Sequence, residues 1–242
     1  MKKIIAIHGI LGSGKDTVVT FIKMHLCLSK IYESQTPDVN SWLQVAIENI
    51  NNADWGVQLS NVKIERFALP LKAIIAAFLG CSINDLNSQE FKKVKLNPEI
   101  WHSSFKPELT IRDLHTDISD GIKQFINNEI FATTCIERCK NAQDELVIIN
   151  DLRYPFEMDV CIFNNIFTLK IQRPEADAAH QAMLEAKGEV HSSEQGLPTE
   201  QFDCLVRNDS TYADLAIRLA DAMLDMQLVT NDYVRWYKNS IL

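Results

Sequence analysis

Five short apolar runs, rich in β-branched residues, divide the chain into regular segments. The runs are KIIAIH (3–8), VKIERF (62–67), ELVIIND (145–151), FTLKIQR (167–173) and FDCLVRN (202–208). The first and third are apolar at consecutive positions, which is typical of strands that are covered on both faces. This pattern predicts a central parallel sheet of five strands.

Helical periodicity fills most of the sequence between these strands. The predicted helices span about 14–29, 39–52, 68–79, 110–128, 129–141, 175–187 and 211–227. Strands that alternate with helices imply right-handed crossovers, so helices are expected on both faces of the sheet. The sequence therefore predicts an α/β fold with three layers, α/β/α, around the five-stranded sheet.

Two segments fit this scheme poorly. Residues 81–109 are polar, contain prolines and are weakly periodic, so we expect a surface excursion there. Residues 228–242 carry aromatic side chains without a clear period. For this tail we expect a docking or oligomer contact, which suggests a homodimer.

Composition limits the classes of function that the chain can have. Its 242 residues are 46% hydrophobic and 23% charged, as expected for one globular domain over 1–242. No apolar run approaches the roughly 20 residues that span a bilayer, and the net charge of −8 disfavours a nucleic-acid interface. Six dispersed cysteines indicate the reduced thiols of a cytoplasmic protein. The start, MKKIIAIHGILG, lacks a small-residue cleavage site and predicts a buried strand rather than a signal peptide.

The segment GILGSGKD (9–16) carries the strongest chemical signal. It matches the pattern G-x-x-x-x-G-K, with Gly9, Gly14 and Lys15 in register, directly after a predicted strand and at the start of a predicted helix. Gly12, Ser13 and Gly14 place successive backbone N–H groups where they form a nest for phosphate oxygens. Lys15 is expected to reach the β- and γ-phosphates. The loop thus predicts a nucleotide site with ATP as the phosphoryl donor.

Asp16 stands where such loops usually carry serine or threonine, and Thr17 follows one position late. Carboxylate and hydroxyl oxygens are hard ligands, which Mg²⁺ favours. We therefore expect both residues to bind nucleotide and Mg²⁺, with the Thr17 hydroxyl within reach of an α-phosphate oxygen. The alternative is that Asp16 only stabilises the helix N-terminus through its charge.

Several further motifs follow the loop along the chain. They are ERFALPLK (65–72), TIRDLHTDISD (110–120), INDLRYPFE (149–157), HSSEQGL (191–197) and VRND (206–209). Together with GILGSGKDT (9–17), they resemble the bacteriophage deoxynucleoside monophosphate kinases, which are P-loop kinases more distantly similar to dephospho-coenzyme A kinase. The resemblance covers most of the chain. It implies a cytoplasmic P-loop kinase, in a host cell if phage-encoded, that transfers the γ-phosphoryl group of ATP to a deoxynucleoside 5′-monophosphate with Mg²⁺.

The same resemblance implies an acceptor-binding helical region at about 68–141. Arg112 looks like the family's arginine for the acceptor phosphate, with Lys72 in support and Arg66 or Arg138 as further candidates. Thr116 and Phe131 are further predicted substrate contacts, Phe131 by stacking on the base.

Asp151 and Arg153 follow the third predicted strand, at the end where open α/β sheets bind ligands. Asp151 is expected to bind the nucleotide sugar or Mg²⁺-coordinated water. Arg153 is expected to clamp a phosphate bidentately, on the acceptor together with Arg112, which makes it both a substrate contact and a catalytic candidate beside Lys15 and Asp16. Glu157, four positions later, is expected to pair with Arg153.

The last part of the chain is expected to contribute a lid and the adenine end of the site. A lid-like segment is predicted at about 174–196, with Arg173 near the phosphates and His191 and Glu194 in a polar network. Asn208 ends the last strand, where such kinases contact adenine.

One helix departs from the family pattern, because 110–120 carries Arg112, Asp113, Thr116, Ser119 and Asp120 where the family resembles R-K-x-x-Q-x-x-G-T. Two alternatives therefore stay open. The acceptor could be another small molecule, of dephospho-coenzyme A or phosphomevalonate type, or the chain could be a nucleotide-binding regulator without catalysis.

Overall fold

The computed structural model describes residues 3–50, 52, 55–56, 60–88, 90–101, 106, 108–187 and 196–241. The chain divides into two compact units. The sheet unit comprises Met1–Glu65 and Cys139–Leu242, and the helical unit comprises Arg66–Arg138. Each unit is built around its own apolar core.

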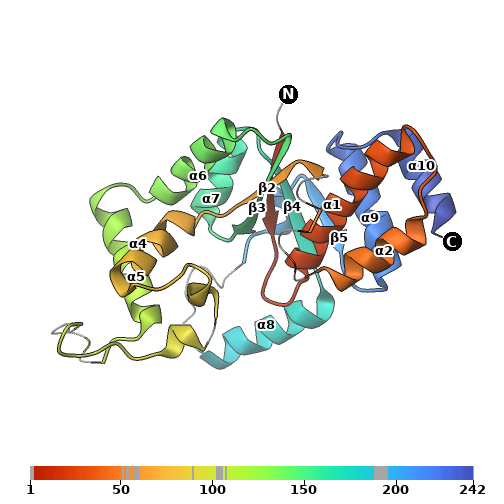
Figure 1. Ribbon diagram of the computed structural model, residues 1–242. Coiled ribbons are helices and arrows are strands. Elements are labelled where there is room, and N and C mark those ends of the chain that lie inside the picture. Colours follow the sequence, from red (N-terminus) through yellow and green to blue (C-terminus); the bar gives the residue numbers. More distant parts are fainter. Residues whose placement is uncertain are drawn as a thin grey trace. The chain divides into compact units, whose positions relative to one another are not determined.

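The sheet unit contains the predicted parallel sheet (Figure 1). Its strands are β1 (Lys3–His8), β2 (Val62–Glu65), β3 (Leu146–Leu152), β4 (Phe167–Gln172) and β5 (Cys204–Arg207). They lie in the order β2-β3-β1-β4-β5, and every neighbouring pair is parallel. The predicted α/β class and the five-stranded parallel sheet are confirmed, and the chain start is a strand as expected.

The sheet unit has helices on both sides of this sheet (Figure 1). They are α1 (Lys15–Tyr32), α2 (Val39–Glu48), α7 (Pro155–Phe163), α8 (Pro174–Lys187), α9 (Tyr212–Asp225) and α10 (Asn231–Ser240). Helices α1 and α9 lie on one side of the sheet and α7 lies on the other (Figure 1). The sequence analysis did not predict α7 or α10. Yet α7 has Pro155 in its first turn and Glu157 at its third position, which is a start signal for a helix.

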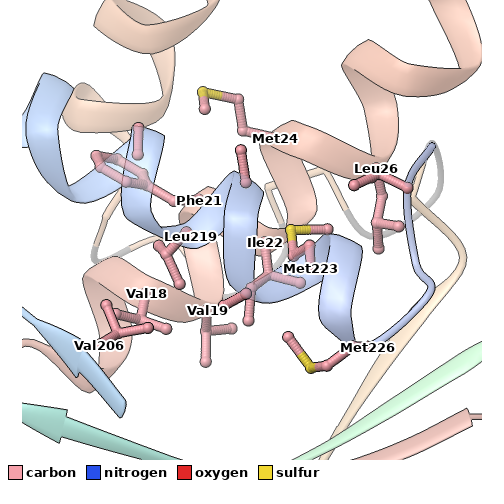
Figure 2. Close-up of a cluster of buried hydrophobic side chains, with 14 of the residues drawn as sticks. Val18, Val19, Phe21, Ile22, Met24, Leu26, Val206, Leu219, Met223 and Met226 are labelled. Atoms are coloured by element: carbon pink, nitrogen blue, oxygen red, sulfur yellow. The ribbon is translucent and has the colours of Figure 1, made fainter. Parts of the chain in front are cut away.

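Helix α1 forms the centre of the main core. All residues from Thr17 to Leu28 are buried, so this helix is enclosed on every side rather than amphipathic. Figure 2 shows its apolar side chains, among them Phe21 and Ile22, against Leu219 and Met223 of α9. Each such buried side chain stabilises the fold by about 1.5–3 kcal/mol. The core therefore holds rigidly the helix whose first turn carries Lys15 and Asp16.

The aromatic tail packs inside the same chain as helix α10. Tyr233 and Tyr237 are buried, and both rings contact the ring of His25 on α1. His25 donates from Nε2 to the Ala216 carbonyl, and its Nδ1 accepts from the Tyr233 hydroxyl at 2.8 Å. The Tyr233 and Tyr237 rings of the tail are thus engaged within the chain, and the homodimer stays a prediction.

The helical unit contains α4 (Leu69–Leu79), α5 (Ile111–Phe125) and the greater part of α6 (Ile130–Asn141). The predicted surface excursion at 81–109 includes two short 3₁₀ turns, Asp85–Asn87 and Phe91–Lys93. A cluster of buried side chains joins these elements, with Leu71 and Ile75 from α4, Leu114 from α5 and Phe131 from α6. In the parts of both units that the structure describes, no helix is long and apolar enough to cross a membrane.

Candidate active site

The loops that follow four strands lie at one edge of the sheet, because all the strands are parallel. Gly9 follows β1, Arg153 follows β3, Arg173 follows β4 and Asn208 follows β5. Strand β1 lies between β3 and β4. Open parallel sheets bind ligands outside the carboxyl ends of such strands, so this edge is the candidate site.

The glycine loop turns tightly between β1 and α1. Gly14 is the N-cap of α1 and has φ 94°, a left-handed conformation that a side chain strains. At Gly9, a Cβ atom would overlap the hydroxyl of Ser13. Ser13 is fully buried, and its hydroxyl has no hydrogen-bond partner among the described residues. The Ser13 hydroxyl is therefore a buried polar group inside the loop to which no described residue hydrogen-bonds. The neighbouring Gly12 is exposed and also has a positive φ.

Lys15 folds back onto the loop from which it projects. Its Nζ donates to the carbonyl oxygens of Gly9 and Ile10, the second at 3.0 Å. Burial lowers the pKa of Lys15 to about 8, and the positive charge of Arg153 adds to this shift, while Asp16 and Asp151 oppose it. A dianionic phosphate beside this amine would reverse the shift, so the site favours an anion electrostatically.

Asp16 and Thr17 lie in the first turn of α1 with different exposure. Asp16 is exposed, and Thr17 is 9% exposed. The described residues contain no cluster of three or more His, Cys, Asp or Glu side chains that would hold a metal by itself. Mg²⁺ usually keeps water and takes only one or two carboxylates plus substrate phosphates, so a single exposed carboxylate beside the loop fits this ion.

Asp151 and Arg153 stand at the end of β3 on a backbone held by Glu157. One carboxylate oxygen of the buried Glu157 accepts from the Arg153 N–H at 2.8 Å and from the Tyr154 N–H at 3.1 Å. Burial and the neighbouring charge of Asp151 raise the pKa of Glu157 to about 8. Glu157 thus binds the backbone of Arg153, and the Arg153 side chain is exposed to solvent.

His8 is the last residue of β1 and is buried next to the same charges. It donates from Nδ1 to the Leu152 carbonyl at 2.9 Å, which fixes the neutral tautomer. Burial lowers its pKa to about 4, with further lowering by Lys170, Lys15 and Arg153. His8 is therefore uncharged at neutral pH. The charge of Arg153 lowers the pKa of His8, Lys15 and Glu157, so these three groups share its electrostatic influence.

Two side chains from the far strands contact carbonyl groups of the glycine loop. Asn208 donates from Nδ2 to the Ser13 carbonyl at 2.9 Å. Arg173 lies with Nη1 at 3.5 Å from the Gly12 carbonyl and pairs with Glu175 at 3.6 Å. Both predicted residues therefore lie at the loop. The observed side-chain contact of Asn208 is to the loop backbone.

The predicted acceptor residues belong to the helical unit. His115 on α5 has a pKa lowered to about 4, by burial and by the charges of Lys72, Lys92, Arg112 and Lys123. The positive charges of Lys72, Lys92, Arg112 and Lys123, the cationic cluster of this unit, thus all act on His115, and such a potential favours a phosphate.

Three other side chains of the helical unit have local contacts. Lys72 donates to Asn87 at 2.7 Å, and the Thr116 hydroxyl donates to the Arg112 carbonyl at 3.1 Å. Phe131 is 8% exposed in the core of this unit, so most of its ring packs internally.

Part of the predicted lid lies outside the described residues. Helix α8 accounts for 174–187, and Gly196 is described, but His191 and Glu194 lie outside the described residues.

The further candidates for the acceptor phosphate, Arg66 and Arg138, contact each other. The Arg138 guanidinium donates a hydrogen bond to the Arg66 carbonyl at 3.1 Å.

A parallel sheet whose central strand leads through a glycine loop into a helix that begins with lysine has the fold of a P-loop kinase. The family model for deoxynucleotide monophosphate kinase matches residues 72–219, more than half of the chain. The chain therefore belongs to the deoxynucleotide monophosphate kinase family, which implies a phosphotransferase of that kind. A search of curated proteins finds no significant match.

The matched range includes Arg112, Asp151, Arg153 and Asn208 but begins after the glycine loop. The role of the loop therefore rests on its own geometry. Sequence reasoning did not identify His8 or His115 as neighbours of these charges. It expected Glu157 to pair with Arg153, whereas the observed hydrogen bonds go to backbone N–H groups. The signal for this role was present, because an acidic residue at the third position of a helix that begins with proline is a capping pattern.

Proposed function

We propose that the protein transfers the γ-phosphoryl group of ATP to a deoxynucleoside 5′-monophosphate and releases ADP and the diphosphate. One observation carries this proposal: Lys15 lies in a glycine loop at the end of the central strand, within the electrostatic reach of Asp151 and Arg153 from β3. The family supplies the acceptor class. In such an enzyme the attacking phosphate oxygen and the leaving oxygen of ADP lie in line, and no covalent enzyme intermediate forms.

The donor side of the reaction follows from the loop. The N–H groups at the start of α1 and the Lys15 amine bind the β- and γ-phosphates. To reach them, Lys15 exchanges the carbonyls of Gly9 and Ile10 for phosphate oxygens. Arg153, exposed and oriented by the Glu157-bound backbone, neutralises charge on the transferred group.

Asp16 and Thr17 would hold Mg²⁺ beside the phosphates, with Asp151 contributing through water or binding the sugar. The exposed carboxylate of Asp16 is the hard oxygen ligand that this ion requires, and no rearrangement of the core is needed to present it. The ion would supply further charge neutralisation on the β- and γ-phosphate oxygens.

On the acceptor side, we assign the monophosphate to the cationic cluster of the helical unit, with Arg112 as its bidentate ligand and Lys72 in support. Thr116 and Phe131 stay the predicted contacts to the rest of the acceptor. The segment at about 174–196 is the proposed lid, which would exclude water and suppress ATP hydrolysis. Such an enzyme would act in the cytoplasm, of a host cell if the chain is phage-encoded.

A coupled assay for ADP release tests this function. Purified protein with ATP and Mg²⁺ is offered each of the four deoxynucleoside monophosphates, dephospho-coenzyme A and phosphomevalonate in turn. We expect turnover of at least one deoxynucleoside monophosphate, and loss of that turnover in Lys15→Ala. Turnover of only dephospho-coenzyme A or phosphomevalonate would make that compound the acceptor instead of a deoxynucleoside monophosphate. ATP binding without turnover of any acceptor would identify a regulator instead.

A further inference from the structure

Asn208 is attached to the carboxyl end of the sheet by its backbone and to the glycine loop by its side chain. Its N–H donates to the Gln172 carbonyl at the end of β4 at 2.8 Å, which continues the β4–β5 ladder. Its side-chain amide donates to the Ser13 carbonyl, 195 residues away along the chain, at 2.9 Å. The residue therefore connects the end of β5, an edge strand of the sheet, to the start of α1.

Ser13 is held at more than one point. Its N–H donates to the Ile10 carbonyl at 3.2 Å, and its carbonyl accepts from Asn208. The peptide that joins Ser13 to Gly14 is trans, so its C=O and N–H point in opposite directions. Because Asn208 binds the C=O, the N–H of Gly14 points to the other side of the peptide. Among the described residues this N–H has no intrachain acceptor.

The glycine at position 14 is matched to Asn208. A Cβ atom at Gly14 would overlap the Asn208 amide nitrogen, so the amide occupies space that only glycine leaves open. Glycine at position 14 thus permits both the positive φ of 94° and the hydrogen bond from the Asn208 amide to the Ser13 carbonyl. Neither contact needs adenine, ribose or any other part of a nucleotide.

From these contacts we infer that Asn208 is a positioning residue, which fixes the Ser13–Gly14 peptide so that its N–H is presented to the phosphates of the donor. This role differs from contact with adenine, the assignment that the position at the end of the last strand suggests. It deepens the proposed function and rests on the loop binding nucleotide phosphates. It predicts that Asn208 contributes to the affinity for polyphosphate itself, whichever base is attached.

Binding of inorganic tripolyphosphate separates the two roles, because this ligand has no base or sugar. Isothermal titration calorimetry is performed with tripolyphosphate, ATP and GTP on the wild-type chain and on Asn208→Ala. Loss of one positioning hydrogen bond is expected to weaken all three affinities by a similar factor, about 10-fold. An unchanged tripolyphosphate affinity together with a weaker ATP affinity would overturn the inference in favour of base recognition.

Asn164 offers a matched control. Its side-chain amide donates to the Val160 carbonyl at 2.9 Å, the same kind and length of bond, also half-buried, at the end of α7. Asn164→Ala is expected to leave tripolyphosphate affinity unchanged. An equal loss in both variants would show a general effect on stability and would contradict a specific role for Asn208.

Asn208→Asp keeps the shape of the side chain but cannot donate to the Ser13 carbonyl, so it tests the inference if the alanine variant does not fold. We expect it to weaken tripolyphosphate binding at least as strongly as Asn208→Ala, and wild-type affinity in this variant would refute the inference. In the kinase assay, the KM for ATP should rise in both variants while the KM for the acceptor stays constant. If wild-type protein binds tripolyphosphate but phosphorylates no acceptor, the proposed function fails while the binding data still decide the role of Asn208. If the wild-type protein does not bind tripolyphosphate, the inference fails.

Discussion

Replacing Glu157 with glutamine should stabilise the protein in alkaline solution and leave its stability almost unchanged in acid. The reason is the burial of the carboxyl group beside Asp151, which raises its pKa from 4.5 to about 8 in the folded chain. In the unfolded chain the group ionises near its ordinary pKa. Glutamine keeps a carbonyl oxygen that can accept from the N–H groups of Arg153 and Tyr154, as the Glu157 carboxyl oxygen does.

The sign and size follow from proton linkage. Below pH 4.5 the carboxyl group is protonated in both states, so Glu157 and glutamine are nearly equivalent. Between that pH and about 8, only the unfolded state releases the proton, and folding then loses about 1.4 kcal/mol per pH unit. Above about 8 the loss is constant, at about 5 kcal/mol for the whole shift.

Urea unfolding of the wild-type chain and Glu157→Gln, measured from acid to alkaline pH, is the assay. The stability difference should grow in favour of glutamine as the pH rises and then level off. Glu33 is exposed on the surface, so Glu33→Gln provides the control for the removal of an unburied carboxylate. A difference for Glu157→Gln that stays constant across the range would refute the reasoning, since it would mean that the buried carboxyl titrates normally.

Four further substitutions test other parts of the structure. Because the pKa of Lys15 is about 8, wild-type ATP affinity should fall as the pH rises above that value; Lys15→Arg should flatten this profile in a calorimetric titration, and an unchanged profile would contradict the assignment. Gly14→Ala should lose at least about 10-fold in tripolyphosphate affinity, because the residue has φ 94° and its Cβ would overlap Asn208; wild-type affinity would show that the loop adapts. Arg112→Ala should raise the KM for the acceptor about 10-fold or more with the KM for ATP unchanged, and equal changes in both would argue against an acceptor role. Tyr233→Phe should cost about 1–3 kcal/mol in urea unfolding, because buried His25 loses a partner, and it should leave ATP affinity intact.

Much of the fold could be predicted from the sequence because its signals are local. The consecutive apolar residues of β1 and β3 are what a strand covered on both faces requires. The glycine loop was recognisable because backbone geometry alone dictates its pattern. Helix α10 was missed although its buried residues, Tyr233, Val234 and Tyr237, have the spacing of one helical face, because the segment is short and most of its other residues are polar or charged.

The contacts that complete the site could not be predicted in the same way. Asn208 and Ser13 are 195 residues apart and meet only because parallel strands bring their carboxyl ends to one edge. The sequence indicates the strand that Asn208 ends, but not the direction of its side chain. Likewise, the raised pKa of Glu157 depends on burial and on the distance to Asp151, and neither is a property of the local sequence.

The most direct test of the proposed reaction follows the phosphoryl group itself. Purified protein is incubated with Mg²⁺, γ-labelled ATP and an equimolar mixture of the four deoxynucleoside monophosphates, and the products are separated by chromatography. The proposed function predicts that the label moves to the β-position of a deoxynucleoside diphosphate, and that Lys15→Ala abolishes this transfer. Label found only in inorganic phosphate, or label that stays in ATP, would contradict it.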